Sequence, residues 1–77
     1  MKNCKLYELP ENKQGTVTTI NFQKNVSVRL MELGFVKGAK VAMIKKSPKQ
    51  KLFIVSLLNF NLSMRKDVAS LIEVEYE

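Results

Sequence analysis

The sequence lacks histidine and tryptophan, and it has a single cysteine, Cys4. Histidine is the usual general base, proton shuttle and metal ligand at neutral pH, so its absence removes the commonest route to catalysis. One cysteine cannot form an internal disulfide bond, and Cys4 has no second cysteine or histidine with which to share a metal. We therefore expect Cys4 to be a free, inert thiol in a frayed N-terminal segment.

Carboxylates and glycines are also few, with seven Asp and Glu and three Gly in 77 residues. Glu73 and Glu75 share one face of an expected strand, so they could form a weak oxygen site for a hard cation. A solvated strand face is the favoured interpretation of the same pair. Gly15, Gly34 and Gly38 lie too far apart to form a phosphate-binding loop. These absences predict a protein that is no enzyme and has no cofactor and no tightly bound metal in the monomer.

Long hydrophobic runs are absent too. The longest apolar runs are residues 52–55 and 57–58, far short of the ~20 residues that a membrane-spanning helix needs. The N-terminus lacks the apolar stretch of a signal peptide. We expect a single cytoplasmic domain, residues 1–77, with no membrane span and a small core, because a chain of this length buries only about 60% of its unfolded surface.

Positive charge is the most abundant chemical feature. The 13 Lys and Arg exceed the seven Asp and Glu, which gives a net charge of +6 and a pI near 9.7. Such a balance favours an acidic partner: nucleic acid, lipid headgroups or an acidic protein surface. Six lysines gather within fifteen residues: Lys37, Lys40, Lys45, Lys46, Lys49 and Lys51. These lysines either form a binding patch or keep a β-hairpin soluble and protect its edges from pairing with other chains.

The hydrophobic pattern predicts short strands around one helix. Strands are expected at residues 15–20, 40–46, 52–57, 60–64 and 72–76, where β-branched or alternating residues dominate. Val17 and Ile20 break strict alternation, which predicts a bend or bulge between them. In strand 52–57, the pattern places Phe53, Val55 and Leu57 on one face.

Helices and turns are expected between these strands. A helix over residues 25–33 would begin at Asn25 as its N-cap and carry Val26, Leu30 and Leu33 along one side. Residues 47–51 form a basic loop, Leu58-Asn59 a tight hairpin turn, and residues 65–71 a short helical segment. Five strands that cover one another's edges indicate a small closed barrel.

Residues 29–41 carry the most particular motif. Gly34 stands where a helix C-terminus favours a left-handed residue, and Gly38 marks a corner before the next strand. The motif resembles the signature of the FeoA family, small cytoplasmic proteins of bacterial ferrous iron uptake. The matching positions are Arg29, Leu30, Leu33, Gly34, Phe35, Gly38 and Val41.

The resemblance extends over most of the chain. The opening strand matches the family at Leu9, Pro10, Gly15, Val17 and Ile20, and the closing segment matches it at Leu62, Met64, Arg65, Ala69, Ile72 and Val74. Asn12 and Asn59 replace glycines that the family usually carries, and asparagine is a common substitute at left-handed turns. Val68 stands where an acidic residue is common. The resemblance implies a mainly β fold: a five-stranded SH3-like barrel, with a helical insertion after the first strand and a short helix before the last.

The same resemblance implies a function in protein contact. FeoA-like proteins act with FeoB, a membrane GTPase that carries ferrous iron into the cell, and they are thought to modulate it by docking on its cytoplasmic region. This chain would then be a non-enzymatic adaptor, peripheral to the inner face of the membrane through its partner. The candidate partner-binding residues are Phe35, Lys37, Lys45, Lys46, Lys49 and Lys51.

Two alternatives remain open at this point. Phe35 is either the buried hydrophobic contact of the helix C-cap or an exposed anchor for a partner. The chain as a whole could instead be a basic small-barrel module for nucleic-acid binding or a transcription accessory. That function would need exposed aromatics interleaved with basic residues, whereas most aromatics here occupy positions that indicate a core, so we expect no specific nucleic acid as a partner.

Overall fold

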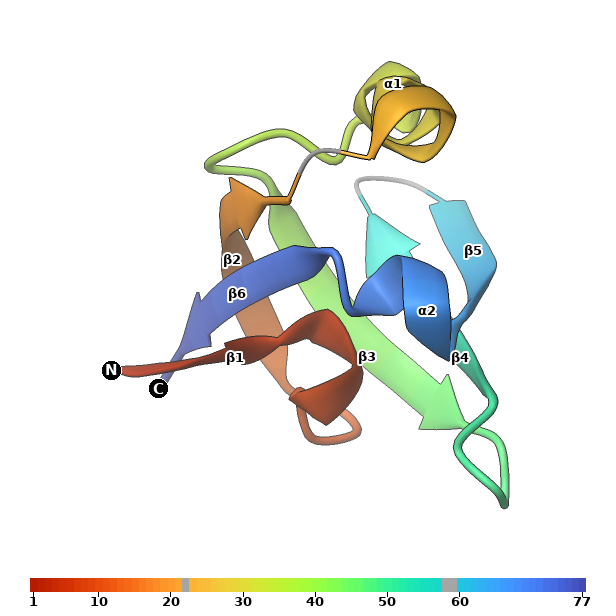
Figure 1. The fold of residues 1–77 in the computed structure, drawn as a ribbon. Helices are drawn as coiled ribbons and strands as arrows, with labels where there is room; N and C mark the ends of the chain where they lie inside the picture. Colours follow the sequence, from red (N-terminus) through yellow and green to blue (C-terminus); the bar gives the residue numbers. More distant parts are fainter. Residues whose placement is uncertain (22, 58–59) are drawn as a thin grey trace.

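The protein folds around a curved antiparallel sheet that the computed structural model describes over residues 1–21, 23–57 and 60–77 (Figure 1). Six strands form the sheet in the order β1-β6-β2-β3-β4-β5. The strands are β1 (Lys2–Lys5), β2 (Gln14–Ile20), β3 (Lys40–Lys46), β4 (Leu52–Leu57), β5 (Phe60–Arg65) and β6 (Ile72–Tyr76). The helices are the 3-10 turn η1 (Leu6–Glu8), α1 (Lys24–Leu33) and the short α2 (Lys66–Ala69). None of these helices is both long and apolar enough to cross a bilayer.

The expected strands are present, and the mainly β class is confirmed with one strand more than predicted. The additional strand is β1, which pairs antiparallel with β6 from Lys2↔Tyr76 to Lys5↔Glu73. The expectation of a frayed N-terminus was therefore wrong. A polar segment with little strand propensity becomes a strand because the exposed edge of β6 supplies its hydrogen-bond partners. The helical insertion consequently follows the second strand instead of the first.

Two irregularities bend the sheet. The register of β2 against β6 shifts between Val17 and Thr19, which confirms the bend expected from the sequence. This shift brings Val17 opposite Val74 and Ile20 opposite Ile72. A second shift lies in β3 between Met43 and Lys45, opposite β4. Such bulges raise the local twist and allow a short sheet to curl.

The core lies inside the curl of the sheet. In β4 the exposed and buried side chains alternate as predicted, with Phe53, Val55 and Leu57 fully buried. The buried hydrophobic residues come from every element except β1, and they are Leu6, Leu9, Val17, Leu30, Phe35, Val41, Met43, Phe53, Val55, Leu57, Met64, Ala69, Ile72 and Val74. Because several of these side chains come from η1, α1 and α2, the three helical segments take part in covering the core.

The N-cap of helix α1 lies two residues earlier than the sequence indicates. The helix begins at Lys24 after the N-cap Gln23, whose side chain makes no capping bond, so Asn25 lies inside the first turn and is not the cap. The backbone N–H of Gln23 instead donates to Oγ of Ser27 at 2.6 Å, and that buried hydroxyl donates to the carbonyl of Asn21 at 3.3 Å. A side chain from within the helix thus fixes its entry, as the N3 residue does in a capping box, although Ser27 stands one position later.

The gap between the two end strands of the sheet, β1 and β5, is spanned by η1 and α2. Lys66 of α2 places its ammonium 4.9 Å from the ring centroid of Tyr7 in η1, and the Tyr7 ring lies 6.2 Å from that of Phe53. Asn12, in the turn before β2, has a φ of 68°, as expected for a residue that replaces glycine. The expected turn at Leu58-Asn59 lies outside the described residues.

Candidate binding surface

The signature residues build the corner between α1 and β3. Gly34 ends the helix with a φ of 108°, and its N–H donates to the carbonyls of Leu30 and Met31. Gly38 has a φ of 93°, and its N–H donates to the carbonyl of Val17 at 2.7 Å. Leu30 and Val41 are buried, Leu33 is half-buried and Arg29 is exposed. Most of the motif therefore serves the fold, and Arg29 is the member whose side chain faces solvent.

Phe35 is fully buried, so its interpretation as an exposed anchor for a partner is wrong. Its backbone N–H donates to the carbonyl of Leu30 at 2.9 Å across the helix end. The left-handed residue at Gly34 reverses the chain, and the next side chain then points back onto the core. The ring belongs to the C-cap.

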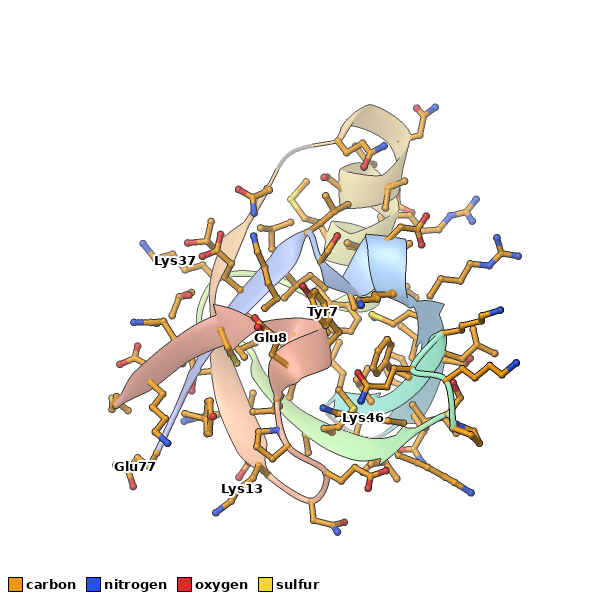
Figure 2. The ribbon with its side chains drawn as sticks, turned by 60° about the horizontal axis from the view of Figure 1, so that its bottom comes forward. Tyr7, Glu8, Lys13, Lys37, Lys46 and Glu77 are labelled. Atoms are coloured by element: carbon orange, nitrogen blue, oxygen red, sulfur yellow. The ribbon has the colours of Figure 1, made fainter. Side chains whose placement is uncertain are left out.

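The candidate lysines occupy different parts of the surface. Lys45, Lys49 and Lys51 are exposed around the hairpin that joins β3 to β4. Lys37 lies at the opposite end of β3, in the turn after α1, and Figure 2 shows it at the left edge of the molecule, well apart from Lys46. The described structure does not join all five candidate lysines in one patch.

Lys46 is half-buried and lies on the inner side of the sheet. Its partner across the strands is the buried Phe53, whereas the neighbouring Lys45 faces the exposed Ile54. The Lys46 backbone N–H donates to Oε2 of Glu11 at 2.8 Å. Successive strand residues point to opposite faces of the sheet. The side chains of Lys45 and Lys46 therefore lie on different faces and cannot contact the same partner surface.

Cys4 is a free, half-buried cysteine of β1 whose thiol is influenced by this inner lysine. Burial raises the pKa of the Cys4 thiol, and the nearby Glu8 carboxylate raises it further, whereas Lys46 lowers it. Because burial has the largest effect, the pKa lies above its ordinary value and the thiolate is scarce at neutral pH. The structure therefore gives Cys4 the environment of a structural residue.

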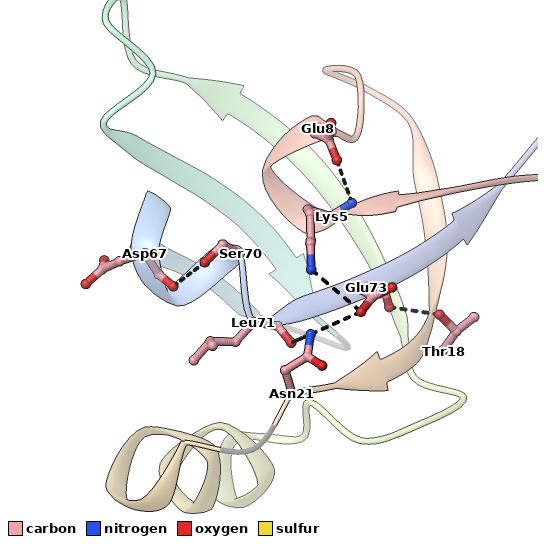
Figure 3. A network of polar contacts seen from close by, with 8 residues as sticks. All are labelled: Lys5, Glu8, Thr18, Asn21, Asp67, Ser70, Leu71 and Glu73. Atoms are coloured by element: carbon pink, nitrogen blue, oxygen red, sulfur yellow. Dashed lines mark hydrogen bonds and ion pairs between the residues drawn. The ribbon is translucent and has the colours of Figure 1, made fainter.

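The carboxylate of Glu73 is engaged in polar contacts within the fold (Figure 3). Its Oε2 accepts a hydrogen bond from Asn21 Nδ2 at 3.0 Å and lies 3.6 Å from the ammonium of Lys5. Thr18 donates its hydroxyl to the Glu73 carbonyl at 3.2 Å. Within residues 1–21, 23–57 and 60–77, no group of three or more His, Cys, Asp or Glu is placed to hold a metal ion.

An apolar groove lies between α1, β5 and α2. Its volume is about 400 Å³. Its sides are largely apolar, and the guanidinium-bearing residues Arg29 and Arg65 are part of the lining. The complete lining is Val26, Arg29, Leu30, Leu33, Leu52, Leu62, Ser63, Met64, Arg65 and Val68. Such a groove can hold an apolar segment of a partner while the two cations select for acidic residues beside it.

Sequence reasoning missed this groove. Its residues come from four elements, α1, β4, β5 and α2, and each one taken alone has the pattern of a core or helix-face residue. The structure leaves Leu33 and Leu62 half-buried, and hydrophobic periodicity does not distinguish a half-buried residue from a fully buried one.

The chain matches the FeoA domain family over residues 4–76. It is 33% identical to the FeoA protein of Chlorobium tepidum, whose solution structure superposes with a TM-score of 0.87 over 95% of this chain and 70% of that one. It is 30% identical to a Stenotrophomonas maltophilia FeoA crystallised with zinc, with a TM-score of 0.81 over 94% of this chain and 89% of that one. That protein is described as an SH3-domain protein and proposed as a ferrous iron transport activating factor.

A third relative is much longer than this chain. It is a fusion of Fe(2+) transport protein A and the Fe(2+) transporter FeoB from Porphyromonas gingivalis strain ATCC BAA-308/W83, 27% identical over 71 residues. The match covers 92% of this chain and only 8% of the fusion protein. The family match over residues 4–76, the shared fold and the signature at the α1–β3 corner together show that this chain belongs to the FeoA family.

Proposed function

We propose that this chain is a non-enzymatic accessory protein of ferrous iron uptake that modulates a FeoB-type transporter by direct contact with its cytoplasmic region. The observation that carries the proposal is the Porphyromonas gingivalis fusion, in which a domain related to this chain and a FeoB transporter form one polypeptide. Fusion in one polypeptide keeps the two domains at a high local concentration. When the same two domains are separate chains, they need a binding interface to stay together.

The groove between α1, β5 and α2 is the docking site in this proposal. The half-buried side chains of the groove lose little conformational entropy when a partner covers them, because packing within the fold already restricts their rotamers. Arg29 and Arg65 would pair with acidic residues of the transporter, since a guanidinium binds a carboxylate through two parallel hydrogen bonds. The binding segment of the partner would therefore present apolar residues flanked by Asp or Glu.

The sequence supports a role without catalysis. It has no histidine, and its one cysteine has a raised pKa, so the usual nucleophile and base pairs are not available. An effect on the transporter would come from the contact itself. The chain would then reside at the cytoplasmic face of the membrane while its partner is bound.

Two substitutions on α1 test the docking site. Val26 is half-buried and lines the groove, whereas Val28 on the same helix is 46% exposed and does not line it. We expect Val26→Ser to weaken binding to the purified cytoplasmic region of the cognate FeoB by roughly fivefold, the equivalent of about 1 kcal/mol of lost apolar contact. Val28→Ser should leave the dissociation constant within about twofold of the wild-type value.

The measurement is biolayer interferometry, with thermal unfolding of each variant to show that it is folded. Equal weakening by both substitutions would contradict the groove as the docking site. No binding of the wild-type chain to the cytoplasmic region would contradict the proposed function itself.

A further inference from the structure

The half of the chain that forms β3, β4 and β5 carries positive charge only. Between Glu32 and Asp67 the sequence has no Asp or Glu. The same stretch has seven lysines and one arginine, which are Lys37, Lys40, Lys45, Lys46, Lys49, Lys51, Arg65 and Lys66. The acidic residues Glu8, Glu73 and Glu75 gather instead on η1 and β6. The molecule is therefore polarised, with a lysine-rich side at the β3–β4 hairpin, where the one acidic contact described is that of Glu11 with the backbone N–H of Lys46.

The outer side of this hairpin also exposes aliphatic side chains. Ile44, Leu52 and Ile54 are 41%, 47% and 38% exposed. The pairing places Ile54 beside Lys45 on β3 and beside Ser63 on β5. We call Ile44, Lys45, Lys49, Lys51, Leu52 and Ile54 the outer hairpin face.

The bulge in β3 creates part of this face. The register shift between Met43 and Lys45 places an additional residue, Ile44, in the strand, and both Ile44 and Lys45 are exposed. In a regular strand these neighbours would point to opposite sides of the sheet. The irregularity thus exposes an aliphatic and a cationic side chain together, at the base of the basic loop.

An open hollow of about 290 Å³ lies on the same face, lined by Lys45, Ser47, Pro48, Leu52, Ile54 and Ser63. Figure 1 shows the β3–β4 loop protruding from the body of the molecule, away from α1 and from the two chain ends. A protruding edge of this kind can reach a flat surface without a clash from the remainder of the fold.

We propose that the outer hairpin face binds the anionic headgroup region of a phospholipid bilayer. Lys45, Lys49 and Lys51 would lie among the phosphates, and Ile44, Leu52 and Ile54 would enter the boundary between headgroups and acyl chains. This combination of lysine charge and exposed aliphatic area is what binds peripheral proteins to anionic membranes. The inference does not depend on the proposed contact with a transporter, because the lipid itself is the ligand.

The composition of the face favours lipid over other acidic partners. Nucleic-acid surfaces use aromatic rings for base stacking, and the apolar members here are all aliphatic. The centres of protein interfaces are enriched in aromatic residues and arginine and depleted of lysine. Lysine is a mobile point charge on a long apolar stem, and it suits diffuse contact with many headgroups better than recognition of one carboxylate.

Vesicle co-sedimentation tests the proposal with the whole chain. The probe is vesicles of equal parts phosphatidylglycerol and phosphatidylcholine, compared with pure phosphatidylcholine vesicles. We expect binding to the anionic vesicles only. The triple variant Lys45→Gln, Lys49→Gln, Lys51→Gln should lower the partition coefficient about tenfold or more, because each lysine near the surface adds to the attraction.

The matched control is Lys2→Gln, Lys13→Gln, Lys37→Gln, which removes the same charge from exposed lysines outside the face. It should lower binding by less than about threefold. Ile54→Ser should also weaken binding, whereas Val36→Ser, at an exposed aliphatic residue in the turn after α1, should not. Circular dichroism of every variant shows that it is folded.

Three outcomes would overturn the proposal. These are the absence of binding to phosphatidylglycerol vesicles, equal losses from the two triple variants, and binding of duplex DNA or of an acidic protein by this face without binding of vesicles. Because no transporter is present in the assay, its result is separate from that of the docking experiment on the groove.

Discussion

Gly38 is a position at which the energetic cost of a left-handed backbone conformation can be measured without steric crowding. Its φ is 93°, and a Cβ added there would meet no heavy atom within 4 Å. Crowding is therefore negligible, and only the conformational preference of the backbone is left. Gly34 at the helix end has a similar φ of 108°, but there the conformation is combined with the capping hydrogen bonds.

We expect Gly38→Ala to lower the free energy of unfolding by about 1 kcal/mol, and Gly38→Asn by less, because asparagine tolerates positive φ. Chemical denaturation measures both. Gly15 is the control, since its Cβ would lie 3.2 Å from the Glu75 carbonyl oxygen and 3.4 Å from Val74 Cβ, and its φ is outside the left-handed region. There asparagine should be worse than alanine. If the alanine and asparagine variants had the same order of stability at Gly38 and at Gly15, a left-handed backbone at Gly38 would not explain the difference.

Cys4 gives a second prediction at the scale of one residue. Burial and Glu8 raise the pKa of its thiol, and Lys46 lowers it. At mildly alkaline pH the folded chain should therefore react with a disulfide reagent more slowly than the chain unfolded in denaturant, because it holds less thiolate. Above the unfolded pKa, deprotonation of Cys4 should also lower the stability of the folded state, since the folded state binds that proton more tightly.

Substitutions around Cys4 test the sign of each effect. Glu8→Gln should lower the thiol pKa and speed the reaction, whereas Lys46→Gln should raise the pKa and slow it. The pH dependence of the reaction rate gives the pKa of each variant. If both substitutions changed the pKa in the same direction, a change of local packing, and not charge, would be the cause.

Among the elements, α1 shows where a local pattern is misleading. Asn25 is the kind of residue that caps helices, but the hydrogen bonds at the helix entry belong to the buried Ser27. We expect Ser27→Ala to destabilise the protein by about 1–2 kcal/mol, because it leaves the Gln23 N–H and the Asn21 carbonyl without this partner. Asn25→Ala should change stability by less than about 0.5 kcal/mol, as exposed substitutions usually do. Thermal unfolding of the two variants compares them, and a larger loss for Asn25→Ala would restore it as the cap.

The strands were the most predictable elements. For β3, β4 and β6 the predicted bounds agree with the structure because turn residues or helical segments interrupt each alternating pattern. β1 was missed, since its stability comes from pairing with residues more than sixty positions away. The sequence also identified the C-cap at Gly34 and the bend in β2.

The candidate site was much less predictable than the fold. A list of lysines does not say which face of a strand each one occupies, and the bulge before Lys45 changes that face. Phe35 had two interpretations that differ only in the direction of one side chain. The groove depends on the distance between α1 and β5, which no local pattern encodes.

At the scale of the whole molecule, the separation of charge decides how acidic polymers interact with it. The lysine-rich side carries its charge on a protruding loop, and neither the groove between α1, β5 and α2 nor the hollow beside the hairpin is lined by more than one of these lysines. Contacts with DNA phosphates would therefore be few and independent of sequence. This leaves the nucleic-acid alternative with charge as its only support.

We expect weak binding to duplex DNA that does not depend on sequence and is abolished by moderate salt. Each phosphate contact releases counterions, so the logarithm of the affinity falls with the logarithm of salt concentration with a slope near 0.9 per contact. Fluorescence anisotropy over a salt series measures this slope. The triple glutamine variant at Lys45, Lys49 and Lys51 should reduce it. Nanomolar, sequence-selective binding at physiological salt would instead support the nucleic-acid function.

The position of β6 in the sheet has a consequence for the order in which the chain can fold during synthesis. β6 lies between β1 and β2, although it follows every other described strand in the sequence. The β3–β4–β5 meander needs only local pairings and can form as soon as it is made. β1 and β2 have to wait for residues 72–76 before they acquire their shared neighbour. A nascent chain that stalls before those residues would therefore expose β1 and the β6-facing edge of β2 to chaperones and proteases, while β2 keeps its pairing with β3, so that quality control can recognise an incomplete copy.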